Sequence, residues 1–323
     1  MNLGLAQRKR ATTLLSVSLL SVLVGSAVGQ AWVPEKGEGS FSTSYNYISS
    51  SGHFKTDGNK VAEAAAKAQS VSFDVEYGVT NKLAVSFSVP IVAARYVGTN
   101  PPIAFLRNLF DQTMQAAAPG TYGHQFLDDG SYHSTIQDFQ FGARYNLVSR
   151  PLVLTPFVAV VIPSHDYAYV GEAAPGRNLR EFQFGANVAR RLTPFLPKAY
   201  LDGQVLFAIS QENLHVRTNR TNLSLETGYF ITRKLAARGF GIWQHTFTGL
   251  RFPIDLTTPE IALTHERLLK ARYWHVGGGI SYVISSKTEV GADIVSFVSG
   301  SDTHYGTGVS LRITRTFTRK PPP

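Results

Sequence analysis

The chain has 323 residues, no cysteine and a formal net charge of +9. Without cysteine, neither a disulfide framework nor a thiolate metal site can form. The basic residues are scattered, and no run of them suggests a groove for nucleic acid. Aromatic residues make up 11% of the chain while methionine occurs only twice, which favours many half-buried strands over a helical core.

The N-terminus has the layout of a secretory signal peptide. Arg8, Lys9 and Arg10 precede a short apolar run over 14–24, and small residues follow it. The run is shorter than the roughly 20 apolar residues that a membrane-spanning helix needs. We therefore expect residues 1–29 to be a cleaved signal peptide, with cleavage after Ala31 as the alternative site. A retained N-terminal anchor helix is a less favoured alternative. Removal of the three basic residues leaves a charge of +6 on the mature chain.

Apolar and polar residues alternate along most of the remaining chain. Val71, Phe73 and Val75, for example, alternate with Ser72 and Asp74, so that one face of the strand is apolar and the other polar. Such segments are longer than the usual strand of about 5 or 6 residues and suit a tilted membrane-spanning strand of about 9–11 residues. The expected strands are 38–48, 68–79, 82–95, 134–147, 152–163, 181–192, 198–209, 218–231, 234–246, 272–284, 287–298 and 304–317.

The connections between these segments alternate in length. Short turns near 80–82, 148–151, 232–233 and 285–287 alternate with long segments at 49–67, 96–133, 164–180 and 247–271. Short periplasmic turns and longer outer loops are typical of outer-membrane barrels, and an even strand count returns both chain ends to the periplasm. The predicted fold is all-β: a single transmembrane antiparallel β-barrel of about twelve strands over residues 30–317. A disordered tail is expected at 318–323, and a soluble β-sandwich is the alternative.

The polar faces of the strands carry charges of both signs. We expect the following residues to line the lumen: Asp74, Glu76, Asp138, Arg144, Arg191, Asp202, Glu226, Arg238, Glu289, Asp293 and Arg312. Because buried charges must be paired, a partly plugged lumen is favoured over an open polar path. Phe230, Phe240 and Ile242 add an apolar patch to the same faces.

Two helices are expected in the long loops. Residues 103–114 carry apolar side chains at helical spacing, and they form either a lid over the barrel mouth or a cap that only packs on the rim. A second helix is expected over 259–270, where Thr258 caps the start and Pro259 takes the first position.

The sequence predicts no catalytic, cofactor or metal site. Ser164, His165 and Asp166 are adjacent, but a Ser-His-Asp triad is assembled in space rather than along the chain. Capping of the local turn by Asp166 is the favoured interpretation. The histidines considered as metal ligands are dispersed and lack ligand spacing: His124, His133, His215, His245, His265 and His275.

Several stretches resemble a known family. They are the mature start at 31–39, the segment from Ile162 to Tyr167, and residues 219–222 and 228–230. Together with Phe317, an aromatic near the C-terminus, they are similar to outer-membrane proteins of the family called MetA-pathway of phenol degradation. The resemblance implies a barrel in the bacterial outer membrane and the uptake of aromatic or other hydrophobic small molecules. It carries over no binding residues.

The expected function is a porin-like outer-membrane channel or transporter for small solutes, hydrophobic or aromatic ones included, and not an enzyme. The expected partners are outer-membrane lipid, the secretion and barrel-assembly machinery and an unidentified solute, but no nucleic acid. Two alternatives stay open. One is a barrel enzyme acting on lipids, supported only by His245 and His275 near strand ends. The other is a structural or adhesive barrel without transport.

Overall fold

The computed structural model describes residues 31–100, 102–116, 125–251 and 265–318. The expected signal peptide at 1–29, His124, the start of the second expected helix at 259–264 and the tail at 319–323 lie outside these residues.

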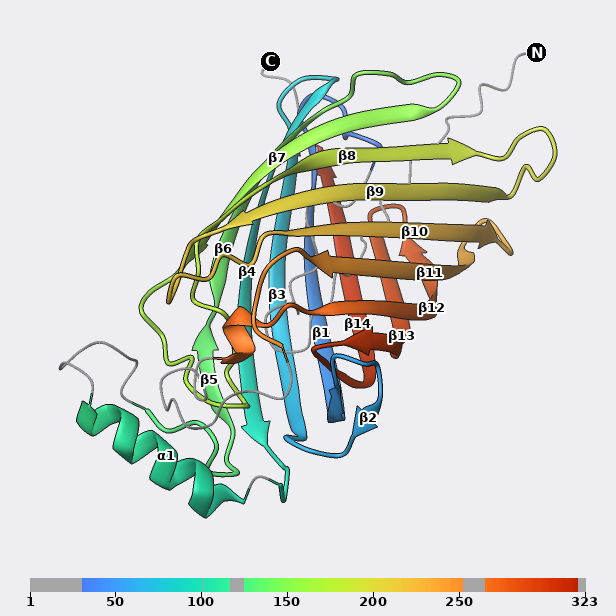
Figure 1. Ribbon diagram of the computed structural model, residues 1–323. Coiled ribbons are helices and arrows are strands. Elements are labelled where there is room, and N and C mark those ends of the chain that lie inside the picture. The colour runs from blue at the N-terminus through green and yellow to red at the C-terminus, as the bar shows by residue number, and fades with distance from the viewer. Residues whose placement is uncertain (1–30, 101, 117–124, 252–264, 319–323) are drawn as a thin grey trace, which may run out of the picture.

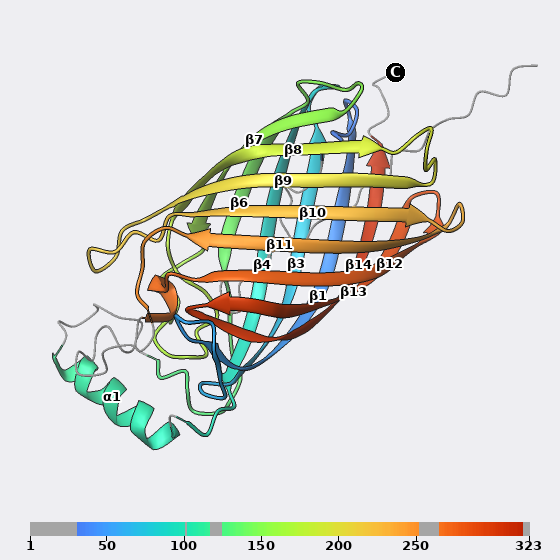
Figure 2. The same ribbon diagram turned by 45° about the vertical axis from the view of Figure 1, so that its right-hand side comes forward.

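A closed wall of twelve antiparallel crossings forms the body of the protein (Figures 1 and 2). Each crossing pairs with the next one along the chain, and β14 pairs with β1 from Glu38–Thr318 to Phe54–Thr303. The all-β barrel and its strand number are therefore as the sequence predicts. The strands are β1 (Glu38–Phe54), β3 (Ala66–Gly78), β4 (Leu83–Tyr96), β5 (His133–Ile136) with β6 (Asp138–Tyr145), β7 (Val153–Pro163), β8 (Glu181–Arg191), β9 (Ala199–Ser210), β10 (Arg220–Phe230), β11 (Leu235–Thr246), β12 (Arg272–Ser285), β13 (Thr288–Ser301) and β14 (Thr303–Thr318).

Strand β1 runs six residues further than the alternation predicts. The expected end at 48 was wrong because the following residues are small and polar, yet they continue to pair with β14 as far as Phe54. The register shifts between Ser50 and Gly52, which marks a β-bulge. Gly52 has φ +150° there, and a Cβ on it would lie 2.0 Å from the carbonyl oxygen of Val61 on the two-residue strand β2 (Lys60–Val61). Only glycine fits this close approach.

The polarity of the two faces of the wall is the reverse of that in a soluble protein: apolar side chains are exposed and polar side chains are buried. On β10, Leu225 points outward and is 58% exposed, whereas its neighbour Glu226 points inward and is 0% exposed. Large apolar side chains on other strands are likewise exposed, while serines, asparagines and charged residues of the same strands are buried. A soluble sandwich would bury its apolar faces. The exterior suits hydrocarbon instead, and the alternative of a soluble sandwich is wrong.

The two ends of the barrel differ. β1 begins and β14 ends at the end that carries the short turns, whereas α1 (Ile103–Ala116) and the long connections lie at the other end (Figure 1). The helix predicted over 103–114 is confirmed. By the usual arrangement of such barrels, the short turns face the periplasm and the end with α1 faces outward. We call the outward end the mouth.

No helix in the described part of the chain is long and apolar enough to cross a membrane.

Replacement of Leu225 tests whether the outer face of the barrel wall contacts lipid. Because this side chain faces outward at the middle of β10, we expect Leu225→Lys to lower the free energy of unfolding by about 2–4 kcal/mol. Denaturant unfolding of the barrel in lipid vesicles, followed by tryptophan fluorescence, measures the change. Leu225→Ala serves as the control for loss of the side chain alone. Equal stability of the lysine and alanine variants would contradict a lipid-facing Leu225.

Candidate functional site: the barrel lumen and its mouth

A charged network lies on the inner faces of neighbouring strands in the periplasmic half of the barrel. Arg238 donates from Nε to Asp293 Oδ1 at 2.8 Å and from Nη1 to Glu226 Oε2 at 3.2 Å. Tyr200 donates its hydroxyl to the other oxygen of Glu226 at 2.6 Å. These groups come from β9, β10, β11 and β13, and all are buried or nearly so. Each charge has an opposite partner, which is what burial of charges requires.

Aromatic rings fill part of the same cross-section. A Cβ on Gly228 would lie 2.1 Å from the Tyr200 ring, so only glycine lets this ring lie flat against β10. The Tyr200 ring also contacts Trp32 at 6.2 Å and Phe230 at 5.7 Å between ring centroids. These rings therefore occupy part of the lumen at this level.

The start of the described chain lies inside the periplasmic half of the barrel. Ala31 is fully buried, its carbonyl oxygen accepts a hydrogen bond from Thr155, and its nitrogen lies 3.5 Å from Asp202 Oδ2. The carbonyl oxygen of Trp32 accepts a hydrogen bond from Arg144 at 3.3 Å, and Arg144 also pairs with Glu76. This inner segment therefore narrows the lumen from below.

A second charged group lies closer to the mouth. Glu181 at the start of β8 pairs with Arg220 of β10 and with Arg177 of the preceding loop. Arg177 also donates to Thr218 and to the carbonyl oxygen of Arg267. These bonds connect the barrel wall to two of the long loops, which we call the β7–β8 loop (164–180) and the β11–β12 loop (247–271).

A buried carboxylate holds the β7–β8 loop in place. Asp128 accepts the backbone N–H groups of Glu172 and Ala173, both at 2.9 Å. Burial raises the pKa of Asp128 to about 6, against the lowering effect of the two N–H donors. The loop is therefore attached to the chain that follows α1.

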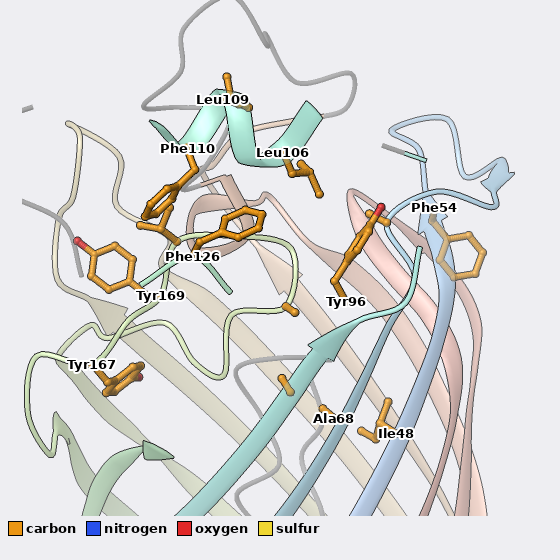
Figure 3. Packing of buried hydrophobic residues seen from close by; sticks show 14 of the residues in the cluster. Ile48, Phe54, Ala68, Tyr96, Leu106, Leu109, Phe110, Phe126, Tyr167 and Tyr169 are labelled. Carbon is orange, nitrogen blue, oxygen red and sulfur yellow. The ribbon is translucent and has the colours of Figure 1, made fainter. Parts of the chain in front are cut away.

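Apolar side chains cover the mouth under α1 (Figure 3). Leu106 and Phe110 of α1 join a cluster that includes Phe126, Tyr96 at the end of β4 and Tyr169 of the β7–β8 loop. The rings of Phe110 and Phe126 lie 5.4 Å apart. We call this set the cap cluster. It places α1 over the mouth, where side-chain packing attaches its apolar face.

Most of the expected lumen residues lie where the alternation places them. Those that are buried on the inner face are Asp74, Arg144, Asp202, Glu226, Asp293 and Arg312, and Arg238 is almost fully covered. Glu76 and Asp138 are partly buried, and they contact Arg144 and Tyr167 respectively. Glu289 lines a small pocket with Tyr200 and Phe230. Arg191 lies exposed at the periplasmic end of β8. A role of these residues in lining a solute path stays a prediction.

Sequence reasoning missed part of the charged interior. Glu181 and Arg220 have the parity of the inward positions on β8 and β10, so the alternation could have found them. Arg177 and Arg267 lie in loops, where no periodicity tells which way a side chain points.

Ser164, His165 and Asp166 do not form a triad. Ser164 Oγ lies 2.8 Å from His165 Nδ1, but Asp166 accepts a hydrogen bond from Asn178 at 3.0 Å. Asp166 is therefore bonded across the loop to Asn178, and capping of its own turn stays a prediction.

Histidines that lie far apart in the sequence meet at the mouth. His53, His304, Glu172 and Glu266 bring donor atoms within 4.8 Å of one another, and His265 Nε2 lies 3.2 Å from Glu266. Burial raises the pKa of Glu172 to about 7, although His265 acts in the opposite direction. Burial also disfavours ionisation of Glu266, but His304 and its neighbours hold that pKa well below its usual range. Of the six histidines considered from sequence spacing, the structure places His265 in this group; His53 and His304 were not among those six.

Comparison with solved structures supports the fold. The crystal structure of the COG4313 outer membrane channel from Pseudomonas putida F1 superposes with a TM-score of 0.67 at 12% identity, over 90% of this chain and 98% of that one. The chain is a transmembrane β-barrel of the bacterial outer-membrane type. The P. putida toluene transporter TodX (TM-score 0.42, 10% identity, 90% and 92% coverage) and the CymD monoaromatic hydrocarbon channel (0.44, 10%, 88% and 90%) are more distant. No protein family and no curated protein sequence matches the chain.

Loss of Arg238 tests the pairing in the lumen. Arg238→Met removes the cation that bonds to both Glu226 and Asp293, so we expect a loss of about 3–5 kcal/mol in the free energy of unfolding. Adding Glu226→Gln and Asp293→Asn should restore part of the loss, because both carboxylates are then neutral. A triple variant no more stable than Arg238→Met would contradict the network.

The contacts of Ala31 predict where the precursor is processed. Cleavage after Ala31 would remove its bond with Thr155 and its contact with Asp202, whereas cleavage after Gly29 keeps both. We expect the intact mass of the purified mature protein to correspond to a chain that begins at Gln30. A mature chain that begins at Trp32 would contradict this assignment.

Proposed function

We propose that the protein is a channel for small solutes across the bacterial outer membrane. The observation that carries the proposal is the inverted barrel: a closed wall with apolar side chains outside and polar, paired charges inside. A path for solutes requires a polar interior of this kind, which plugged barrels share with open channels. Outer-membrane lipid contacts the exterior, and we expect the secretion and barrel-assembly machinery to deliver the chain there.

A small cavity lies on the proposed path. Below the mouth, a cavity of about 50 Å³ is lined by residues that include Arg177, Arg220, Gln244 and Glu266. It has room for about four water molecules. Passage of a larger solute therefore requires a displacement, either of the cap cluster at the mouth or of the inner segment at residues 31–36.

The order of surfaces along the path suits small amphipathic or aromatic molecules. A solute entering at the mouth meets the cap cluster first. Inside, the rings of Tyr273, His275 and Phe297 form a stack on the inner faces of β12 and β13, with His275 lying 4.2 Å and 3.5 Å from its neighbours. Beyond these rings, the solute meets the paired charges of the lumen. Apolar rings beside charged groups fit a ring-bearing solute with a polar substituent better than a plain sugar.

No contact among the described residues favours a lipid-acting enzyme. His275 is enclosed between Tyr273 and Phe297. His245 packs beside Trp243 and Phe247, an aromatic group of the kind that lies at a membrane interface. We therefore infer a transport role without catalysis.

Loosening of α1 tests the channel. Leu106→Ser combined with Phe110→Ser should open the mouth, because each large-to-small change in a packed cluster costs about 2–5 kcal/mol and every 1.4 kcal/mol shifts a closed-to-open equilibrium tenfold. We expect proteoliposomes with this variant to admit solutes at least several-fold faster than the wild type, and a benzoate-sized aromatic acid faster than a sugar of similar mass.

The matched control is Phe105→Ser, which removes an exposed apolar side chain from the same helix. It should leave permeability unchanged. If neither the wild type nor the opened variant admits any solute class, the protein is not a channel.

A further inference from the structure

Five titratable side chains from three separate parts of the barrel converge at the mouth. His53 ends β1, His304 begins β14, Glu172 lies in the β7–β8 loop, and His265 and Glu266 lie in the β11–β12 loop. We call them the mouth cluster. Their side chains are at most 9% exposed. None of them belongs to the charged networks of the lumen, so the proposed channel function does not account for them.

The distances between the donor atoms match those around one metal ion. His53 Nε2 lies 3.6 Å from Glu266 and 3.9 Å from Glu172, and His265 Nε2 lies 3.2 Å and 3.7 Å from the same carboxylates. A tetrahedral zinc ion with bonds of about 2.0–2.2 Å separates its ligands by about 3.4 Å. His304 Nε2 lies 2.8 Å from the second oxygen of Glu266.

The surroundings of His304 orient its ring for this role. Its Nδ1 lies 3.3 Å from Ser50 Oγ, and that hydroxyl hydrogen can be donated to the carbonyl oxygen of Gly52 or Tyr305, both at 3.4 Å. Ser50 can therefore accept the proton of Nδ1. Nε2 donates to Glu266 in the described structure, and a bound metal would displace that proton. An outer partner that fixes the tautomer in this way is the usual companion of a metal-bound histidine.

Two carboxylate oxygens in the cluster are consistent with a missing cation. Oε2 of Glu172 and Oε1 of Glu266 are buried and accept no hydrogen bond from the described residues. Two carboxylates this deep repel each other unless a positive charge lies between them. Protonation of His304 beside Glu266 supplies one positive charge, and a second charge on His53 would place two cationic rings 4.2 Å apart. A divalent ion neutralises both carboxylates and leaves the imidazoles neutral.

We propose that the mouth cluster binds one divalent transition-metal ion, zinc foremost, which ties the β7–β8 and β11–β12 loops to the barrel wall. Imidazole and carboxylate are ligands that zinc prefers, and the three histidines disfavour magnesium and calcium, which take oxygen ligands. The ion connects residues that border the cavity below, since Glu266 and His304 line it. Bound metal thus holds the mouth closed.

The first test measures binding on the full mature barrel in detergent, after metal removal with a chelator. Isothermal titration with zinc should give one site per chain, unchanged by excess magnesium. The double variant Glu172→Gln/Glu266→Gln should weaken binding by more than about 100-fold, beyond the loss usual for outer-shell partners. His265→Asn, which alters only a loop, should weaken it also. His245→Ala removes a histidine outside the cluster and should bind as the wild type does.

Heat-modified mobility in gels shows whether each variant is a folded barrel. A folded wild type that binds no more zinc than the double variant would overturn the proposal. Because titration requires no solute passage, this result is independent of the channel experiment.

The second test measures whether zinc fixes the position of the β7–β8 loop relative to the barrel wall. The chain has no cysteine, so Ser51→Cys on β1 and Ala168→Cys in the β7–β8 loop, both outside the cluster, can carry a pair of spin labels. We expect zinc to narrow the distribution of distances between the labels in the wild-type background and not in the double glutamine variant. An unchanged distribution at saturating zinc would overturn the role of the metal in holding the loop.

Discussion

Closure of β14 on β1 is the constraint on which the rest of the structure depends. Backbone amides cannot remain unpaired in hydrocarbon, so a membrane sheet must have no free edge. The long register from Glu38–Thr318 to Phe54–Thr303 meets this requirement. Once the wall is closed, the parity of each strand decides whether a residue meets lipid or lumen, and the inward half of every strand must find partners within a narrow space.

In the lumen, inward charged residues pair with opposite charges at several heights along the barrel. Glu76 with Arg144, Arg238 with Glu226 and Asp293, and Glu181 with Arg220 and Arg177 each combine residues from different strands or loops. Such pairs cost little net stability when complete and much when broken. They can therefore keep a polar interior ordered without apolar packing, and the same polar groups can hydrate a solute path when it opens.

The sequence predicts the wall far better than the mouth, for a physical reason. Alternation reports which face a strand residue occupies, so the strands and inward residues such as Asp74 and Glu226 follow from it. Beyond residue 48 the small polar residues of β1 carry no such signal, although hydrogen bonding to β14 continues. Loop residues have no periodicity at all. The approach of Glu172 and Glu266 to His53 depends on the return of the chain across the whole barrel, which no local pattern records.

The hydrogen bonds and packing contacts at the mouth involve the same two loops, so the loss of one contact weakens the others. Asp128 holds the backbone of Glu172, while the side chain of Glu172 belongs to the mouth cluster. Tyr169, three residues earlier, packs in the cap cluster, and Arg267 lies over its ring at 3.6 Å. Arg267 follows Glu266 and donates to Asn178 at the far end of the β7–β8 loop. A displacement of α1 large enough to admit a solute must loosen Tyr169 and strain Glu172. Whatever stabilises the mouth cluster should therefore also stabilise the closed cap, so the metal that we propose there would act on the channel that we propose.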